Sequence, residues 1–217
     1  ATPAPAGPQT APAPAAPQTA PASPLQRRMW LLDRMAPGSH TYYEPKALLI
    51  EGPLDTDVLR LCLRRVVARH PQLRTVFREH DGELRQVVLD SVRVDCPVTS
   101  LTGCDDATAV LRLRDMADEE PDFDLAAGPL LRARIGRLAD DRHLLYLVAH
   151  HIVIDALSTR ILCRDLAAYY RAWPGEPDGL PDLPAPVSFT HPEPTRHSLM
   201  SYAVCCLKKK NRRRSKI

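Results

Sequence analysis

Helical and strand-type hydrophobic patterns alternate along this chain between Ser23 and residue 173. Apolar residues spaced three or four positions apart predict helices over residues 24–35, 55–70, 105–118 and 157–173. Short apolar runs predict strands over residues 47–51, 73–78, 84–89, 130–138 and 144–149. Elements that alternate in this way pack as helices around a sheet, so we expect an α/β or α+β class with a mixed sheet and flanking helices.

Short local motifs fix where several of these elements begin or turn. Ser23 and Gln26 stand at the ends of Ser-Pro-Leu-Gln, a capping box with proline at the first helical position. Asp55 is placed to cap the following helix. Asp81-Gly82 separates two strand-type runs and is typical of a tight hairpin turn.

The two ends of the chain differ in composition from its middle. Residues 1–22 are almost entirely Ala, Pro, Gln and Thr and contain Pro-Gln-Thr-Ala-Pro-Ala twice, which predicts a disordered, extended linker. Such a segment is either a tether between enzyme modules or an inert tail. Residues 207–217 carry seven positive charges and no acid, so the net charge of +3 leaves −4 for the rest. The mildly acidic body argues against nucleic acid as a partner.

Hydropathy and cysteine spacing limit the cellular setting. The sequence contains no apolar run of the ~18–20 residues that cross a bilayer, and its first residues lack a secretory signal pattern. We therefore expect a cytoplasmic protein without membrane contact. No two cysteines form a Cys-x-x-Cys pair, which favours reduced, packing cysteines over a zinc ribbon or a disulfide scaffold. The six cysteines are Cys62, Cys96, Cys104, Cys163, Cys205 and Cys206.

The candidate chemistry lies in His150-His151-Ile-Val-Ile-Asp155, between an apolar strand and a helix. Side chains alternate along a strand, so one histidine is expected to be buried and structural and the other to face a cavity. A histidine exchanges protons near neutral pH and suits general acid–base catalysis. Two alternatives stay open. The histidines and Asp155 are structural, with Asp155 as a helix cap, or the three bind a metal, which the divergence of adjacent histidines disfavours.

Four segments, in order, resemble motifs of the condensation domains of nonribosomal peptide synthetases. The third resembles the His-His-x-x-x-Asp-Gly signature of that family, and the ordered set is more specific than the signature alone. The segments are Ser23 to Leu32, Arg69 to Phe77, Phe123 to Arg132, and His150 to Ala156.

This resemblance implies a chloramphenicol-acetyltransferase-like N-terminal lobe over residues 23–186, followed by a divergent, unstructured basic tail over residues 187–217. It implies amide bond formation between aminoacyl or peptidyl thioesters carried on the phosphopantetheine arms of partner carrier proteins. No cofactor or metal is expected on the domain itself. By the resemblance His151 is the catalytic residue and His150 is structural. Asp155 is expected to pair with Arg74, or failing that with Arg69.

Two departures from the family pattern affect these expectations. Ala156 stands where the family has glycine, and alanine fits there only with negative φ and room for a methyl group. The resemblance ends near residue 186, before the second lobe with which the family encloses its tunnel. We therefore expect a truncated or frameshifted product or a fragment, with little activity alone. Alternatives are a non-catalytic module that docks carrier proteins, or a related acyltransferase or epimerisation domain.

Overall fold

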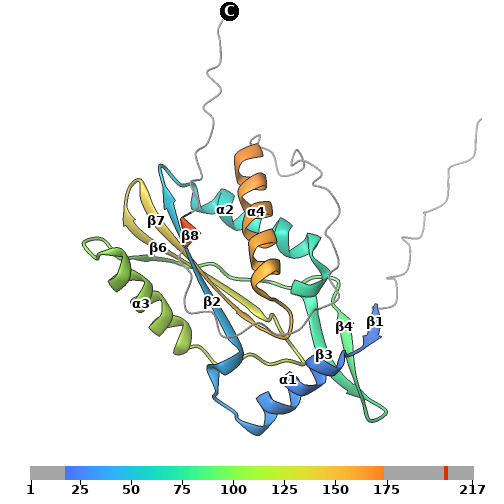
Figure 1. The fold of residues 1–217 in the computed structure, drawn as a ribbon. Coiled ribbons are helices and arrows are strands. Elements are labelled where there is room, and N and C mark those ends of the chain that lie inside the picture. Colours follow the sequence, from blue (N-terminus) through green and yellow to red (C-terminus); the bar gives the residue numbers. More distant parts are fainter. Residues whose placement is uncertain (1–17, 174–202, 205–217) are drawn as a thin grey trace, which may run out of the picture.

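The computed structural model describes residues 18–173 and 203–204, and its centre is a five-stranded mixed sheet of order β5-β6-β7-β2-β8 (Figure 1). The three central strands are antiparallel neighbours: β2 (Tyr43–Glu51), β7 (Arg142–His150) and β6 (Leu131–Ala139). At the edges, β5 (Val98–Ser100) runs parallel to β6 and β8 (Ala203–Val204) parallel to β2.

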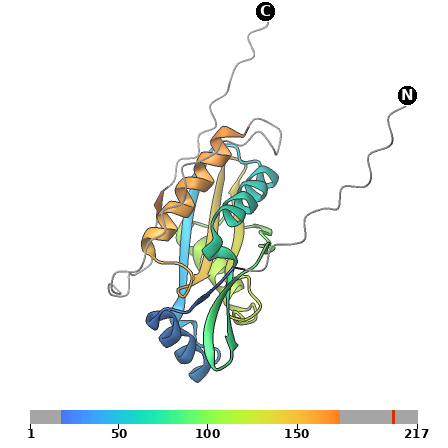
Figure 2. The same cartoon turned by 90° about the vertical axis from the view of Figure 1, so that its right-hand side faces the viewer.

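Helices cover both faces of this sheet. α2 (Thr56–Arg69) and α4 (Ala156–Ala172) pack side by side on one face, as Figure 2 shows. α3 (Asp106–Asp118) covers the other face. Consecutive side chains of β7 accordingly enter different cores: Leu145 and Leu147 pack with α2 and α4, while Leu144 and Tyr146 pack with α3. β7 is therefore buried on both faces, and the side chain of its last residue, His150, lies in the interior.

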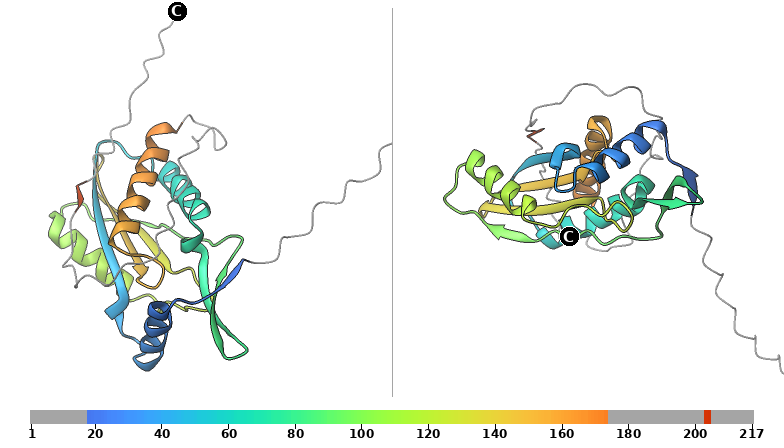
Figure 3. Two further views of the ribbon diagram at one scale, coloured as in Figure 1. Left: turned by 45° about the vertical axis from the view of Figure 1, so that its right-hand side comes forward. Right: turned by 90° about the horizontal axis from the view of Figure 1, so that it is seen from below.

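A smaller antiparallel sheet, of order β1-β4-β3, stands beside the main one (Figure 3). Its strands are β1 (Thr19–Pro21), β3 (Thr75–His80) and β4 (Glu83–Val88). α1 (Pro24–Met35) follows β1 directly and is joined to β2 by the short 3₁₀ turn η1 (His40–Tyr42). A second 3₁₀ turn, η2 (Pro71–Arg74), connects α2 to β3.

The local motifs fold as predicted. The Ser23 hydroxyl accepts the Gln26 amide hydrogen at 3.2 Å, and the Gln26 side chain accepts the Ser23 amide hydrogen at 2.9 Å, which completes the capping box. Asp55 caps α2 by accepting the amide hydrogen of Val58 at 3.1 Å. Asp81 and Gly82, with φ of 51° and 76°, form the turn of the β3–β4 hairpin. Positive φ at both central residues is what a tight two-residue hairpin turn of this kind requires.

Several predicted boundaries are wrong. Residues 19–21 are not part of a linker, because they form β1, and Ala22 is buried against β4 with its amide hydrogen on the Leu84 carbonyl at 2.9 Å. Pro21 is tolerated there because β1 is an edge strand. Residues 203–204 of the expected unstructured tail form β8. β2 starts at Tyr43, before the predicted residue 47, and β5 was not predicted at all. Residues 1–17 and most of 187–217 lie outside the described residues.

Candidate active site

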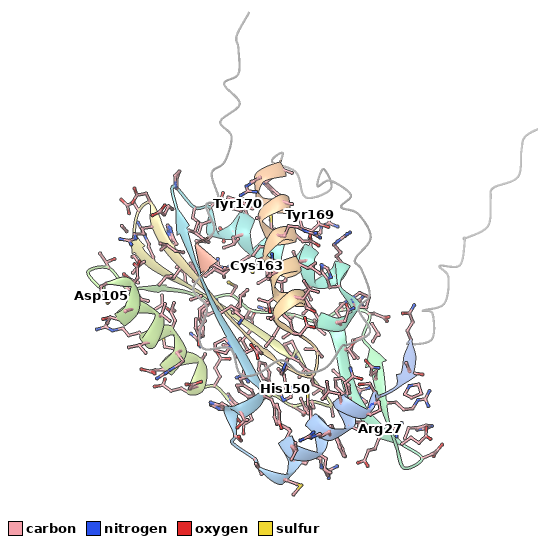
Figure 4. The ribbon with its side chains drawn as sticks, in the orientation of Figure 1. Arg27, Asp105, His150, Cys163, Tyr169 and Tyr170 are labelled. Carbon is pink, nitrogen blue, oxygen red and sulfur yellow. The ribbon has the colours of Figure 1, made fainter. Side chains whose placement is uncertain are left out.

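The loop of residues 151–155 joins the end of β7 to the start of α4. β7 pairs with β2 up to its last residue, where His150 lies opposite Tyr43. One residue further, the His151 amide donates to the Tyr42 carbonyl at 2.7 Å, so the loop leaves the sheet from a fixed point. Figure 4 places His150 at the end of the sheet nearest α1.

His150 is completely buried, and its two ring nitrogens differ in their contacts. Nδ1 accepts the amide hydrogen of Ile152 at 3.1 Å. Nε2 has no hydrogen bond within the described residues and lies 3.4 Å from Asp33 Oδ1. Burial, with a smaller effect of His151, lowers the pKa of His150 to about 4. The ring is therefore neutral at physiological pH, and the contact with Asp33 is not an ion pair.

The walls around His150 are aromatic. Tyr43 and Phe123 meet its ring edge to face, with ring centres 6.0 and 6.4 Å away, and Tyr42 lies at 6.2 Å. The Phe123 amide donates to the Tyr43 hydroxyl at 2.9 Å, and Arg132 lies over the Phe123 ring at 4.1 Å. Such packing fixes the orientation of the imidazole.

His151 differs from its neighbour in being only partly buried. Its Nδ1 lies 2.6 Å from the Ile154 carbonyl oxygen. A carbonyl oxygen can only accept, so Nδ1 carries the hydrogen and the neutral ring keeps its lone pair on Nε2. A partly exposed imidazole with this tautomer has the form that a general base or a hydrogen-bond acceptor requires.

Asp155 closes the loop by capping α4. Its Oδ1 accepts the amide hydrogen of Ser158 at 2.6 Å, and its carbonyl oxygen accepts from the Thr159 amide and hydroxyl, each at 2.9 Å. Ala156 is then the first residue of the helix; it is exposed, and its φ is not positive. Both conditions for replacing glycine by alanine at this position are therefore met.

Arg74 and Arg69 do not make the predicted ion pair with Asp155. Arg74 donates to the backbone carbonyls of Leu89 and, at 3.3 Å, Asp90, which holds η2 against the strand β4. Arg69 is directed toward α4 instead, where its Nε lies 3.2 Å from Asp165 Oδ2. The prediction is wrong, because each guanidinium binds another acceptor: Arg69 binds Asp165, and Arg74 binds the backbone that follows β4.

Asp165 is a buried carboxylate that the sequence reasoning missed. It is 1% exposed and binds His70 Nε2 at 3.0 Å and Arg164 Nη2 at 3.0 Å, besides Arg69. Burial raises its pKa, but hydrogen bonds and charge from Arg164 and His70 outweigh that effect, so its pKa is lowered. The helical period could have found this residue, because Asp165 lies three positions after Leu162 and four before Tyr169 on the inner face of α4.

Contacts connect the four motif segments to one another, and two of these contacts lie at His150 and Ile152. Gln26 of the first segment donates to the Ile152 carbonyl at 3.5 Å, and Phe123 of another packs on the His150 ring. The Phe77 amide, from the β3 segment, donates to the Leu125 carbonyl at 2.7 Å.

In the described ranges 18–173 and 203–204, no three His, Cys, Asp or Glu side chains gather as a metal-binding set, and no helix is long and apolar enough to span a membrane.

We compared the sequence of this chain with models of known protein families and with curated proteins. The family model of the condensation domain matches residues 16–186, most of the chain. The chain belongs to the condensation domain family. Its relatives are nonribosomal peptide synthetases: the chain is 44% identical over 163 residues to the phosphinothricin tripeptide synthetase PhsB of Streptomyces viridochromogenes, and 42% identical over 162 residues to PhsC. Each match covers 73% of this chain, but only 14% and 15% of those proteins.

Solved structures of condensation domains match the fold of this chain. The starter condensation domain of the rhizomide synthetase RzmA matches with a TM-score of 0.64 and 28% identity, over 71% of this chain and 38% of that one. SgcC5 of Streptomyces globisporus matches with a TM-score of 0.64 and 30% identity, over 77% and 39%. The condensation domain therefore has the expected chloramphenicol-acetyltransferase-like fold, and the chain spans less than half the length of these solved relatives.

Proposed function

We propose that this condensation domain forms amide bonds between an aminoacyl or peptidyl thioester on one carrier protein and an amine on a second carrier protein. Membership of the family supports the reaction type. The observation that carries the assignment to this site is the 2.6 Å contact between His151 Nδ1 and the Ile154 carbonyl. It leaves Nε2 as a hydrogen-bond acceptor on a partly exposed ring.

In the proposed reaction, the amine nitrogen attacks the thioester carbonyl carbon. The C–N bond forms, the C–S bond breaks, and the proton lost by the nitrogen passes to the departing sulfur. His151 accepts this proton or holds the amine in place by its Nε2 lone pair; either role needs the fixed tautomer. The phosphopantetheine arms that carry both thioesters belong to the carrier proteins, so the domain needs no bound cofactor.

The supporting residues hold this imidazole without reacting. His150 is the buried, neutral neighbour that fixes the loop from inside. Asp155 ties the loop to the first turn of α4. Arg69 fastens α2 to α4, and Arg74 fastens η2 to the residues after β4, so both act more remotely than a direct partner of Asp155 would.

The test is amide formation between two loaded carrier proteins, measured by mass spectrometry in the complete synthetase that carries the domain. His151→Ala is expected to lower the rate by at least about 100-fold. His80→Ala is the matched control, because His80 is an exposed histidine at the tip of the β3–β4 hairpin. A synthetase that keeps its rate without His151 would show that the domain is a docking module.

Deuterium incorporation distinguishes a condensation domain from an epimerisation domain. An epimerisation domain exchanges the α-hydrogen of the aminoacyl thioester in heavy water without forming a new amide, whereas a condensation domain forms the amide without requiring this exchange. We expect amide product without exchange.

Since the chain covers 38% of the solved RzmA domain, we also expect little product when the chain is assayed alone. Ready turnover by the chain would contradict that expectation.

A further inference from the structure

The face of α1 that meets the His151 loop is partly polar. Gln26 and Asp33 are seven residues apart, two helical turns, and Met29 lies between them on the same face. Met29 is buried, while Gln26 and Asp33 are half-buried. Buried or half-buried polar groups on a packed face need partners. Gln26 binds the Ile152 carbonyl, and Asp33 lies beside the His150 ring.

Gln26 uses every polar atom of its side chain. Oε1 accepts the Ser23 amide hydrogen at 2.9 Å as part of the capping box. Nε2 donates to Gln86 Oε1 at 3.0 Å and to the Ile152 carbonyl at 3.5 Å. Gln86 is itself oriented, since its Nε2 donates to the Pro21 carbonyl at 3.1 Å. The amide of Gln26 therefore connects the start of α1 with the residue that follows His151.

Asp33 lies beside His150, the last residue of β7 before the loop. Because His150 Nδ1 accepts the Ile152 amide hydrogen, the ring hydrogen is on Nε2, and Nε2 faces Asp33 Oδ1 at 3.4 Å. Ile152 is consequently held at both of its backbone polar groups. Its N–H is bound by His150, whose Nε2 lies 3.4 Å from Asp33 Oδ1, and its carbonyl is bound by Gln26.

We propose that α1 positions the His151 ring, with Gln26 and Asp33 as positioning residues that act through Ile152 and His150. Neither residue is placed to touch the substrates. The catalytic part of this inference rests on the proposed function of His151, because positioning matters for the rate only if that ring takes part in the reaction. A shift of the loop by about 1 Å would suffice to cost much of the rate.

Gln26→Glu tests the donor specifically. Glutamate keeps the acceptor that the capping box requires, but it cannot donate to the Ile152 carbonyl and brings a charge toward it. Ser23→Ala is the matched control, because it removes the hydroxyl from the capping box and leaves the Gln26 amide in place. Asp33→Leu and Asp33→Asn form a second pair: only asparagine keeps an acceptor for His150 Nε2.

Two readouts are taken for each variant. The first is the ring nitrogen spectrum of the histidines in the ¹⁵N-labelled full chain, which reports the tautomers of His150 and His151 without any activity. The second is the condensation rate of the complete synthetase. We expect Gln26→Glu and Asp33→Leu to mix the two tautomers and to lower kcat about tenfold, with KM for the carrier proteins unchanged. Ser23→Ala and Asp33→Asn should stay within about twofold of the wild type.

The outcomes separate the inference from the function on which it rests. Unchanged tautomers and rate in Gln26→Glu and Asp33→Leu would overturn the positioning role, even if His151→Ala abolishes condensation. An equal loss in Ser23→Ala and Gln26→Glu would also overturn it, because the stability of α1 would then explain both. If His151→Ala leaves condensation intact, the proposed function fails, while the ring spectra still decide whether α1 holds the loop.

Discussion

Asp165 on α4 and Arg69 at the end of α2 form a buried ion pair, with Oδ2 and Nε 3.2 Å apart. The Asp165 side chain is 2% exposed and that of Arg69 14%. Together with His70, they join the last turn of α2 to the helix that begins directly after the His151 loop. The second motif segment is therefore connected to α4 through Asp165, and Arg69 makes no ion pair with Asp155.

Asp165→Ala should lower the free energy of unfolding by about 3–5 kcal/mol, because it leaves the Arg69 charge buried without its partner. Urea denaturation of the chain measures this. Arg164→Ala is the matched control: Arg164 binds the same carboxylate, but its side chain is 65% exposed, so its loss should cost under about 1 kcal/mol. Equal losses of stability in the two variants would contradict a stabilising role for the buried Asp165–Arg69 ion pair.

His150 makes stability depend on pH in a defined window. Its pKa is about 4 in the folded chain against 6.5 when unfolded, so the unfolded chain binds the extra proton between these values. Stability should therefore decrease as the pH falls from about 6.5 to about 4, by at most about 1.4 kcal/mol per pH unit.

His150→Asn should flatten this dependence, because asparagine does not titrate. The pKa of the buried His143 is also lowered, chiefly by burial, so some dependence should remain in the variant. Asp33, which faces His150, has a raised pKa, mainly through burial, and its effect is opposite in sign and lies nearer pH 4. Urea titrations at several pH values test the prediction; identical slopes for both proteins would refute it.

Ala156→Gly should not improve the domain, although glycine is the residue that the family signature has there. Ala156 begins α4 with an exposed methyl group and no positive φ, so glycine brings only its entropic cost. We expect a loss of up to about 1 kcal/mol and no rise in the condensation rate. Thermal denaturation and the rate assay check both halves. A clear gain in rate would mean that the methyl group obstructs the loop.

Tyr170→Phe should cost about 1 kcal/mol, because the Tyr170 hydroxyl accepts the amide hydrogen of Asp55 at 2.9 Å and so joins α4 to the cap of α2. Figure 4 shows Tyr170 beside Tyr169 near the end of α4. Tyr169→Phe is the control, since the Tyr169 hydroxyl has no hydrogen-bond partner among the described residues. Urea denaturation should separate the two variants, and a larger loss in Tyr169→Phe would contradict this assignment.

Much of the site could be placed from sequence because adjacent side chains on a strand diverge. That rule predicted one buried histidine and one that faces a cavity. The structure confirms the buried one, with His150 at 0% exposure, and has His151 partly exposed; the cavity stays a prediction. The pairing of Asp155 with Arg74 or Arg69, which the family resemblance implied, is wrong. Spacing along the chain contains no information on whether Arg69 meets Asp155 or Asp165, since both acids lie on or next to α4 and only packing chooses between them.

The caps, the hairpin turn and the periodic faces of the helices follow from the local sequence alone. Ser23, Asp55 and the Asp81-Gly82 turn act through hydrogen bonds and backbone angles within three or four residues, where no other part of the chain is needed. The partners of Gln26 and Arg69 lie 126 and 96 positions away along the chain, and they could be identified only in the folded protein. Such contacts form only after the two cores have packed the helices against the sheet, so their geometry depends on the whole fold.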